Sequence, residues 1–168
     1  MWGVARKFGV RPSALSVVRC QLCTLMPFHL AIPVTELAEA KEFYGSVLGL
    51  EEGRSDEVWQ DYSLFGHQLV VHEVSSHSPC SHVQDVDGDH VPVPHFGVCL
   101  TEQQFHTFSQ KLRANKVQFI IEPHRRFQGT AGEQWTMFFK DPSHNNLEFK
   151  AMVNPENLFA KGDESNKE

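Results

Sequence analysis

The sequence has no long hydrophobic run, and its first acidic residue is Glu36. No run approaches the ~18 apolar residues of a membrane-spanning helix, so no transmembrane segment is predicted. With 40% hydrophobic and 21% charged residues, the composition is typical of a soluble globular protein and not of a disordered one. A chain of 168 residues accommodates one domain with a sizeable core.

Cysteine is also scarce, with four residues in the chain. Cys20 and Cys23 have the spacing of a redox or zinc pair, but no second Cys-x-x-Cys motif follows them. Cys80 and Cys99 have no such neighbour. We therefore interpret the cysteines as incidental thiols of a protein in a reducing compartment.

Residues 1–24 carry four basic side chains and no acidic one, which is typical of an organelle transit peptide. We expect a mitochondrial address before a plastid one; the alternative is a disordered extension on a cytoplasmic protein. Removing this segment leaves 11 basic against 21 acidic residues. Such a charge disfavours nucleic acid and anionic membranes as partners, so a small-molecule ligand is expected.

From Met26 onward, the pattern strand, helix, strand, strand, strand occurs twice. In the first half the strands are expected at 28–34, 50–54, 58–64 and 68–74, with a helix capped by Thr35. In the second half they are expected at 95–100, 117–121, 135–139 and 147–152, and Thr101 and Gln104 form a capping box. The polar segment between the halves is interpreted as a linker. Its acidic run 85–89 is no calcium loop, because His90 replaces the required glycine.

Three residues are candidate metal ligands. His29 and His95 occupy the same place in their halves, just inside the first strand. Glu148 stands between Leu147 and Phe149 on an apolar strand, where a carboxylate is costly unless it is paired or metal-bound. Two imidazoles and a carboxylate form a known ligand set for a divalent metal with open positions. The alternatives are hydrogen-bonded core histidines and a salt-bridged glutamate.

Met26 to Asn154 resembles the vicinal oxygen chelate superfamily, which includes glyoxalase I, extradiol dioxygenases and bleomycin or fosfomycin resistance proteins. The motifs are FHLAIPV at 28–34, FYGSVLG at 43–49, PHFGV at 94–98, and FFKDP at 138–142 leading to LEFK at 147–150. EEGRS at 51–55, FGHQL at 65–69, VPVPHFG at 91–97 and IEPHRRF at 121–127 resemble a narrower branch, labelled as predicted extradiol-type dioxygenases.

The resemblance implies an α+β fold in which two βαβββ modules form a cup-shaped mixed sheet around one metal. A single domain would cover 25–154, with modules at about 26–75 and 93–152, a linker at 76–92, and a C-terminal tail at 155–168. The modules could pair within one chain or exchange between two, giving a monomer or a homodimer.

The ligands implied by the resemblance are His29, His95 and Glu148, with a matching place at or near His72. Strand alternation puts Gln68, Val70 and His72 on one face. His72 could be a fourth ligand, an acid/base group beside the metal, or neither. For substrate binding the expected residues are Gln68, Arg126 and Gln134.

The number of ligands separates the candidate activities. Three protein ligands leave room for a bidentate diol and dioxygen on Fe(II), which favours a ring-cleaving, extradiol-like dioxygenase acting on a small catecholic substrate. With His72 as a fourth ligand, a redox-neutral isomerase or lyase with zinc, nickel, cobalt or manganese is favoured. A third alternative is a non-catalytic small-molecule binding protein.

Overall fold

The structure is a computed structural model that describes residues 26–79 and 82–161. The predicted transit peptide at 1–24, and with it Cys20 and Cys23, lies outside the described residues, as does Cys80. None of the helices in the described ranges has the length and apolar character needed to cross a bilayer.

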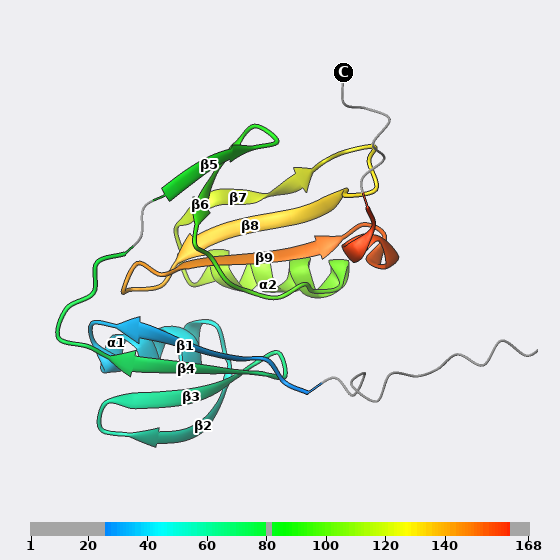
Figure 1. The fold of residues 1–168 in the computed structure, drawn as a ribbon. Coiled ribbons are helices and arrows are strands. Elements are labelled where there is room, and N and C mark those ends of the chain that lie inside the picture. Colours follow the sequence, from blue (N-terminus) through cyan, green and yellow to red (C-terminus); the bar gives the residue numbers. More distant parts are fainter. Residues whose placement is uncertain (1–25, 80–81, 162–168) are drawn as a thin grey trace, which may run out of the picture.

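The first module contains four strands and one helical segment (Figure 1). Its elements are β1 (His29–Val34), α1 (Leu37–Lys41), the π-helix η1 (Glu42–Val47), β2 (Glu51–Asp56), β3 (Trp59–Leu64) and β4 (His67–Glu73). The sheet order is β1-β4-β3-β2, with β1 parallel to β4. Thr35 does not cap the helix as predicted, because Glu36 holds the N-cap position without a side-chain bond. The Thr35 backbone N–H instead donates to Ser143 Oγ (2.9 Å).

The second module repeats this arrangement with one irregular edge. Its elements are α2 (Glu102–Ala114), β7 (Phe119–Arg126), β8 (Gln134–Lys140) and β9 (Asn146–Met152), in the sheet order β7-β8-β9. The predicted capping box of Thr101 and Gln104 is confirmed. The predicted strand at 95–100 makes only isolated parallel bridges to β9. Gly97 lies so close to β9 that a Cβ there would be 1.6 Å from the Glu148 carbonyl oxygen.

The segment predicted as a linker holds a β-hairpin, β5 (His82–Val86) paired antiparallel with β6 (Asp89–Val93). Asp87 (φ 50°) and Gly88 (φ 82°) form its two-residue turn, and both have left-handed backbones. An Asp-Gly pair with two positive φ angles is the signature of a tight hairpin turn. After β9, the predicted tail begins with the short 3-10 helix η2 (Pro155–Phe159).

The two modules share one hydrophobic core. Core side chains from α1, η1, β3 and β4 join those from α2, β8 and β9. Phe43 and Phe139, one from each module, have ring centroids 6.3 Å apart. The hairpin adds a small separate cluster on the other face of the second sheet, formed by Val91, Ile121 and Phe138. The prediction of an α+β fold with two βαβββ modules is confirmed.

Asp141, in the turn between β8 and β9, joins the modules through a buried carboxylate. It is 3% exposed. It accepts hydrogen bonds from Tyr44 OH (2.8 Å), Asn145 N (2.7 Å) and Asn145 Nδ2 (2.8 Å). Asn145 Nδ2 also donates to the Pro33 carbonyl (2.9 Å). Burial, followed by the negative charge of Asp141, raises the pKa of Tyr44, so its hydroxyl stays protonated and donates.

We expect Asp141→Asn to lower the free energy of unfolding by about 2–3 kcal/mol. The asparagine amide has one acceptor oxygen where the carboxylate has two, and it carries no charge, so the buried donors of Tyr44 and Asn145 are not all satisfied. Urea unfolding followed by circular dichroism measures this loss. Asp56→Asn is the matched control, since Asp56 is exposed and its replacement keeps an acceptor oxygen for the Glu57 N–H. Equal losses in the two variants would contradict the role given to Asp141.

Candidate metal centre

His95 and Glu148 form a pair on the hairpin side of the second sheet. His95 Nε2 lies 3.1 Å from Glu148 Oε2. His95 Nδ1 lies 2.7 Å from the Pro92 carbonyl oxygen, which can only accept, so Nδ1 carries the proton and Nε2 faces Glu148. Thr136 Oγ1 donates to Glu148 Oε1 (2.8 Å). The contact with Pro92 thus holds His95, and the contact with Thr136 holds Glu148, while His95 Nε2 and Glu148 Oε2 face each other.

The pair is electrostatically coupled. The hydrogen bond to Glu148 raises the pKa of His95, although burial opposes this. Burial works against ionisation of Glu148, but hydrogen bonds from His95 and Thr136 and the positive charge of Lys150 outweigh it, so the pKa of Glu148 is lowered. In the metal-free protein the carboxylate is therefore ionised, and it favours a protonated imidazole.

The spacing of this pair fits one metal ion. Two donors each ~2.1 Å from a metal and at right angles lie ~3.0 Å apart. The distance of 3.1 Å between His95 Nε2 and Glu148 Oε2 matches that value. Within residues 26–79 and 82–161, no third His, Cys, Asp or Glu joins them in a cluster that could hold a metal. A metal ion at this pair would need further donors from elsewhere.

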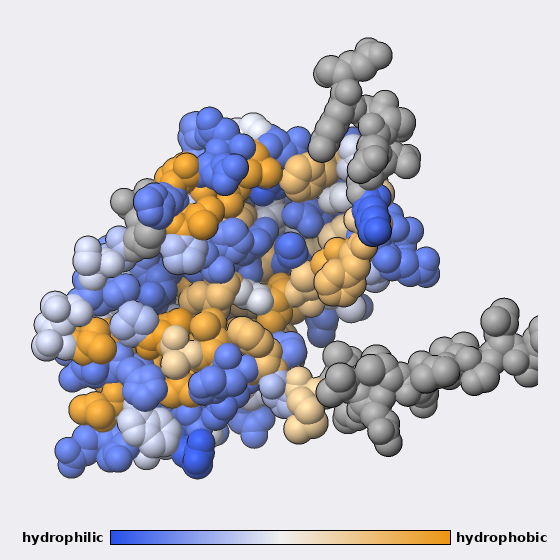
Figure 2. Space-filling model, viewed as in Figure 1, coloured by the Kyte–Doolittle hydropathy of each residue, from blue (hydrophilic) through white to orange (hydrophobic). Residues whose placement is uncertain are grey.

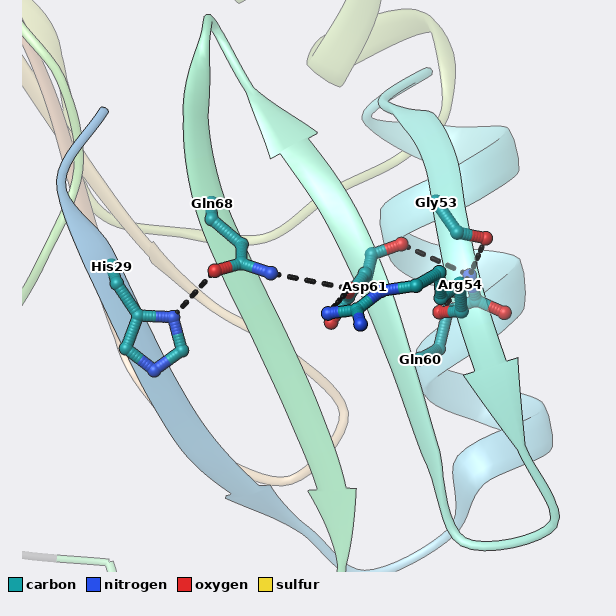
Figure 3. A network of polar contacts seen from close by, with 6 residues as sticks. All are labelled: His29, Gly53, Arg54, Gln60, Asp61 and Gln68. Carbon is teal, nitrogen blue, oxygen red and sulfur yellow. Dashed lines mark hydrogen bonds and ion pairs between the residues drawn. The ribbon is translucent and has the colours of Figure 1, made fainter. Parts of the chain in front are cut away.

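His29 lies on the other module and is exposed. Its Nδ1 is 2.7 Å from Gln68 Oε1, and Gln68 Nε2 donates to Asp61 Oδ2 (3.2 Å). Asp61 in turn pairs with Arg54 (3.2 Å), as Figure 3 shows. This chain of contacts fixes the amide so that its oxygen faces the imidazole. Nδ1 of His29 is then the protonated nitrogen, as in His95, and its Nε2 makes no hydrogen bond with a described residue.

Gln68 therefore orients His29, a role that its prediction as a substrate-binding residue did not include. The orientation of a metal-binding imidazole by a second hydrogen bond is a common feature of metal sites. Gln68 pairs with His29 across β1 and β4, so the contact follows directly from the register.

The two modules have equivalent backbone registers between their first and last strands. The equivalent pairs are Leu30–Leu69 and Phe96–Leu147. One residue further along the last strand, Val70 occupies in the first module the position that Glu148 occupies in the second. Because a valine side chain offers no donor, the first module contributes a histidine without a carboxylate partner.

His72 lies away from this position. On β4, His72 lies four residues beyond Gln68, the partner of His29, and four residues span about 13 Å along a strand. The partner of His72 on β1 is Pro33. Its side chain is exposed, and its ring centroid is 6.5 Å from that of Trp59. The structure does not bring His72 together with His29.

A cavity of about 790 Å³ opens beside His95 and Glu148. The predicted substrate-binding residues Arg126 and Gln134 both line it. Arg126 also anchors the hairpin, since its Nη2 donates to the Val86 carbonyl and its Nε lies 3.1 Å from Asp89 Oδ2. The Nε contact is an ion pair without hydrogen-bond geometry.

The β5–β6 hairpin covers one side of this cavity. It was not predicted from the sequence, where this segment was interpreted as a linker. In Figure 2, hydrophobic side chains gather over β5 and β6 and again over β1 and β4. Val86 and Val91 of the hairpin line the cavity. Lys150, also on the lining, was missed as well, although it stands two residues after Glu148 and so shares its face of β9.

Residues 27–149 match the family model of the Glyoxalase/Bleomycin resistance protein/Dioxygenase superfamily, and the chain belongs to this superfamily. Among solved structures, it resembles a glyoxalase/bleomycin resistance protein/dioxygenase from Alicyclobacillus acidocaldarius, with 31% identity and a TM-score of 0.67 over 79% of this chain and 96% of that one. No curated protein sequence matches the chain.

Two more distant structures share the fold. The fosfomycin resistance protein FosX from Listeria monocytogenes has 18% identity and a TM-score of 0.57, over 77% of this chain and 95% of that one. A glyoxalase/dioxygenase from Nostoc punctiforme has 19% identity and a TM-score of 0.56, over 89% of this chain and all of that one. Members of the superfamily are often metal-dependent enzymes, and neither likeness selects one activity.

Metal binding is expected to release a proton from the His95–Glu148 pair. Because the pKa of His95 is raised, a proton occupies Nε2 below that value, and a metal ion must displace it. Zn²⁺ affinity should therefore increase with pH up to the raised pKa and level off above it, with about one proton released per ion at lower pH. Calorimetry in buffers of different ionisation enthalpy measures both quantities. His72→Ala should behave as the wild type; an affinity independent of pH would contradict the assignment.

Proposed function

We propose that this protein is a ring-cleaving, extradiol-like dioxygenase that uses Fe(II) and acts on a small diol or catecholic substrate. The observation that carries the proposal is the number of donors. The candidate ligands are His29, His95 and Glu148, and Val70, which has no donor atom in its side chain, stands in the place of a fourth. Three ligands on an octahedral ion leave three positions open.

A bound Fe(II) would supply redox chemistry together with adjacent positions for both oxygens of a diol and for dioxygen. The residues of the chain would prepare that environment. Pro92 and Thr136 hold His95 and Glu148 in place. Phe138 packs edge-on against the His95 ring, with centroids 5.1 Å apart, and lines the cavity with an apolar surface suited to an aromatic ring.

We further propose that His29 reaches the site from a second copy of the chain. In one chain the His95–Glu148 pair lacks a third donor among the described residues. The imidazole of His29 is exposed and held by Gln68 with Nε2 free. Nearby in the sequence, Met26 (76% exposed) and Phe28 (64% exposed) are large apolar side chains that a partner would bury.

The alternatives have less support. A redox-neutral isomerase or lyase with four protein ligands would need a donor at the position of Val70 or a large displacement of His72. A non-catalytic binding protein would not need two imidazoles whose Nδ1 atoms are both anchored. These observations favour the oxygenase.

Oxygen uptake by anaerobically purified, Fe(II)-reconstituted protein over a panel of catechols tests the activity. Val70→Glu places a carboxylate opposite Glu148 in the repeat, so we expect it to retain iron but to lose oxygen uptake by at least about tenfold, since the added ligand takes the position for dioxygen. Val70→Leu should keep both properties. Tightly held zinc or nickel in the purified protein, with no uptake for any diol, would overturn the proposal.

Mixing two inactive variants tests the shared site. His29→Ala and Glu148→Ala should each lose bound metal. If His29 comes from a second copy, each mixed dimer contains one intact site and one that lacks both residues. Random exchange of subunits should therefore restore about a quarter of the wild-type metal sites.

The readout is metal content after the two variants are co-refolded or incubated together. A mixture of His95→Ala and Glu148→Ala is the matched control and should restore nothing, because both residues come from the same module. No restoration in the first mixture, with dimers formed, would mean that His29 is not shared between chains.

A further inference from the structure

Lys150 lies on the inner face of the cavity, next to the metal ligands. It follows Glu148 by two residues on β9, so both side chains project from the same face of the sheet. The residue paired with it on β8 is Thr136, which holds Glu148. Its ammonium group acts electrostatically on both His95 and Glu148.

The other charges of the cavity wall are compensated. Glu148 pairs with His95, and Arg126 pairs with Asp89. No described residue forms an ion pair or hydrogen bond with the Lys150 ammonium group. Among the described residues, Lys150 is therefore a cavity-lining cation that makes no direct ion pair, and the negative charge of Glu148 acts on it only through space.

We propose that Lys150 binds an anionic oxygen group of the substrate, a carboxylate or a phosphonate, while the remainder of the substrate occupies the cavity beside His95 and Glu148. The position of the substrate beside His95 and Glu148 rests on the proposed function. The new element is the class of substrate, a small, negatively charged compound. Lys150 is a specificity-determining residue and is not assigned a part in bond breaking.

The rest of the cavity fits such a compound. Its volume of about 790 Å³ is within the usual range for small-molecule sites, which is about 300–1,000 Å³. Phe138, Met152 and Leu158 provide apolar surface for a carbon skeleton, and Gln134 provides a polar amide. A charge that is fixed at one end of an apolar cavity orients a ligand as well as binding it.

Calorimetric titration of the Zn²⁺-loaded full chain tests the proposal, since zinc permits binding without turnover. The first probes are 3,4-dihydroxybenzoate and its neutral counterpart 3,4-dihydroxybenzamide. We expect the wild type to bind the carboxylate at least about tenfold more tightly, the value of a charge-assisted hydrogen bond. Lys150→Met should abolish this preference, whereas Lys150→Arg should keep it. Lys140→Met, at the exposed end of β8, is the matched control and should also keep it.

The same preference in Lys150→Met as in the wild type, or no preference in the wild type, would overturn the proposal. Zinc content and the thermal midpoint of each variant establish that the site and the fold are intact. Loss of affinity for the neutral amide in Lys150→Met would indicate a general disturbance of the cavity and would count against a role in charge recognition.

Benzoate, phenylphosphonate and benzamide separate this inference from the proposed function, because none of them has a diol. A preference for either anion that depends on Lys150, without added affinity for the dihydroxy compounds, would support the anion site and count against the dioxygenase. Tight binding of both diols without a charge preference would support the dioxygenase and count against the anion site. The stronger of benzoate and phenylphosphonate identifies the anionic group.

Discussion

Asp141 carries a buried negative charge that is satisfied by donors from both modules, and this requirement determines how the modules meet. Tyr44 belongs to the first module, while Asn145 belongs to the second and also binds the Pro33 carbonyl. A docking that separated Tyr44 from Asp141 would leave the buried carboxylate without its donor from the first module, which is unfavourable. The shared hydrophobic core then forms around this junction.

This docking places the candidate ligands on two separate surfaces. The second module has a complete pair, His95 and Glu148, under the cover of the β5–β6 hairpin. The first module has His29 on an exposed edge, with Val70 in the place of a carboxylate. A repeat with a histidine in each half and a carboxylate in one half gives three donors, and that number underlies the proposed oxygen chemistry.

The sequence predicted the repeat, the module order and the positions of His29, His95 and Glu148, because alternation and the restart of the pattern are local signals. The hairpin was missed because its polar composition resembles that of a linker; the Asp87-Gly88 pair was the available signal. The expectation for His72 depended on register between β1 and β4, which is a tertiary property that no local pattern specifies. Arg126 was predicted as a substrate-binding residue and lines the cavity, but its contact with the hairpin could be seen only in the fold.

Anomalous diffraction from crystals of the iron-loaded protein tests most directly whether the metal centre has three protein ligands. We expect an iron peak at bonding distance, about 2.0–2.3 Å, from His95 Nε2, Glu148 Oε2 and Nε2 of His29 from a second copy, with the Val70 side open. Iron bound by His72, or bound without Glu148, would contradict it.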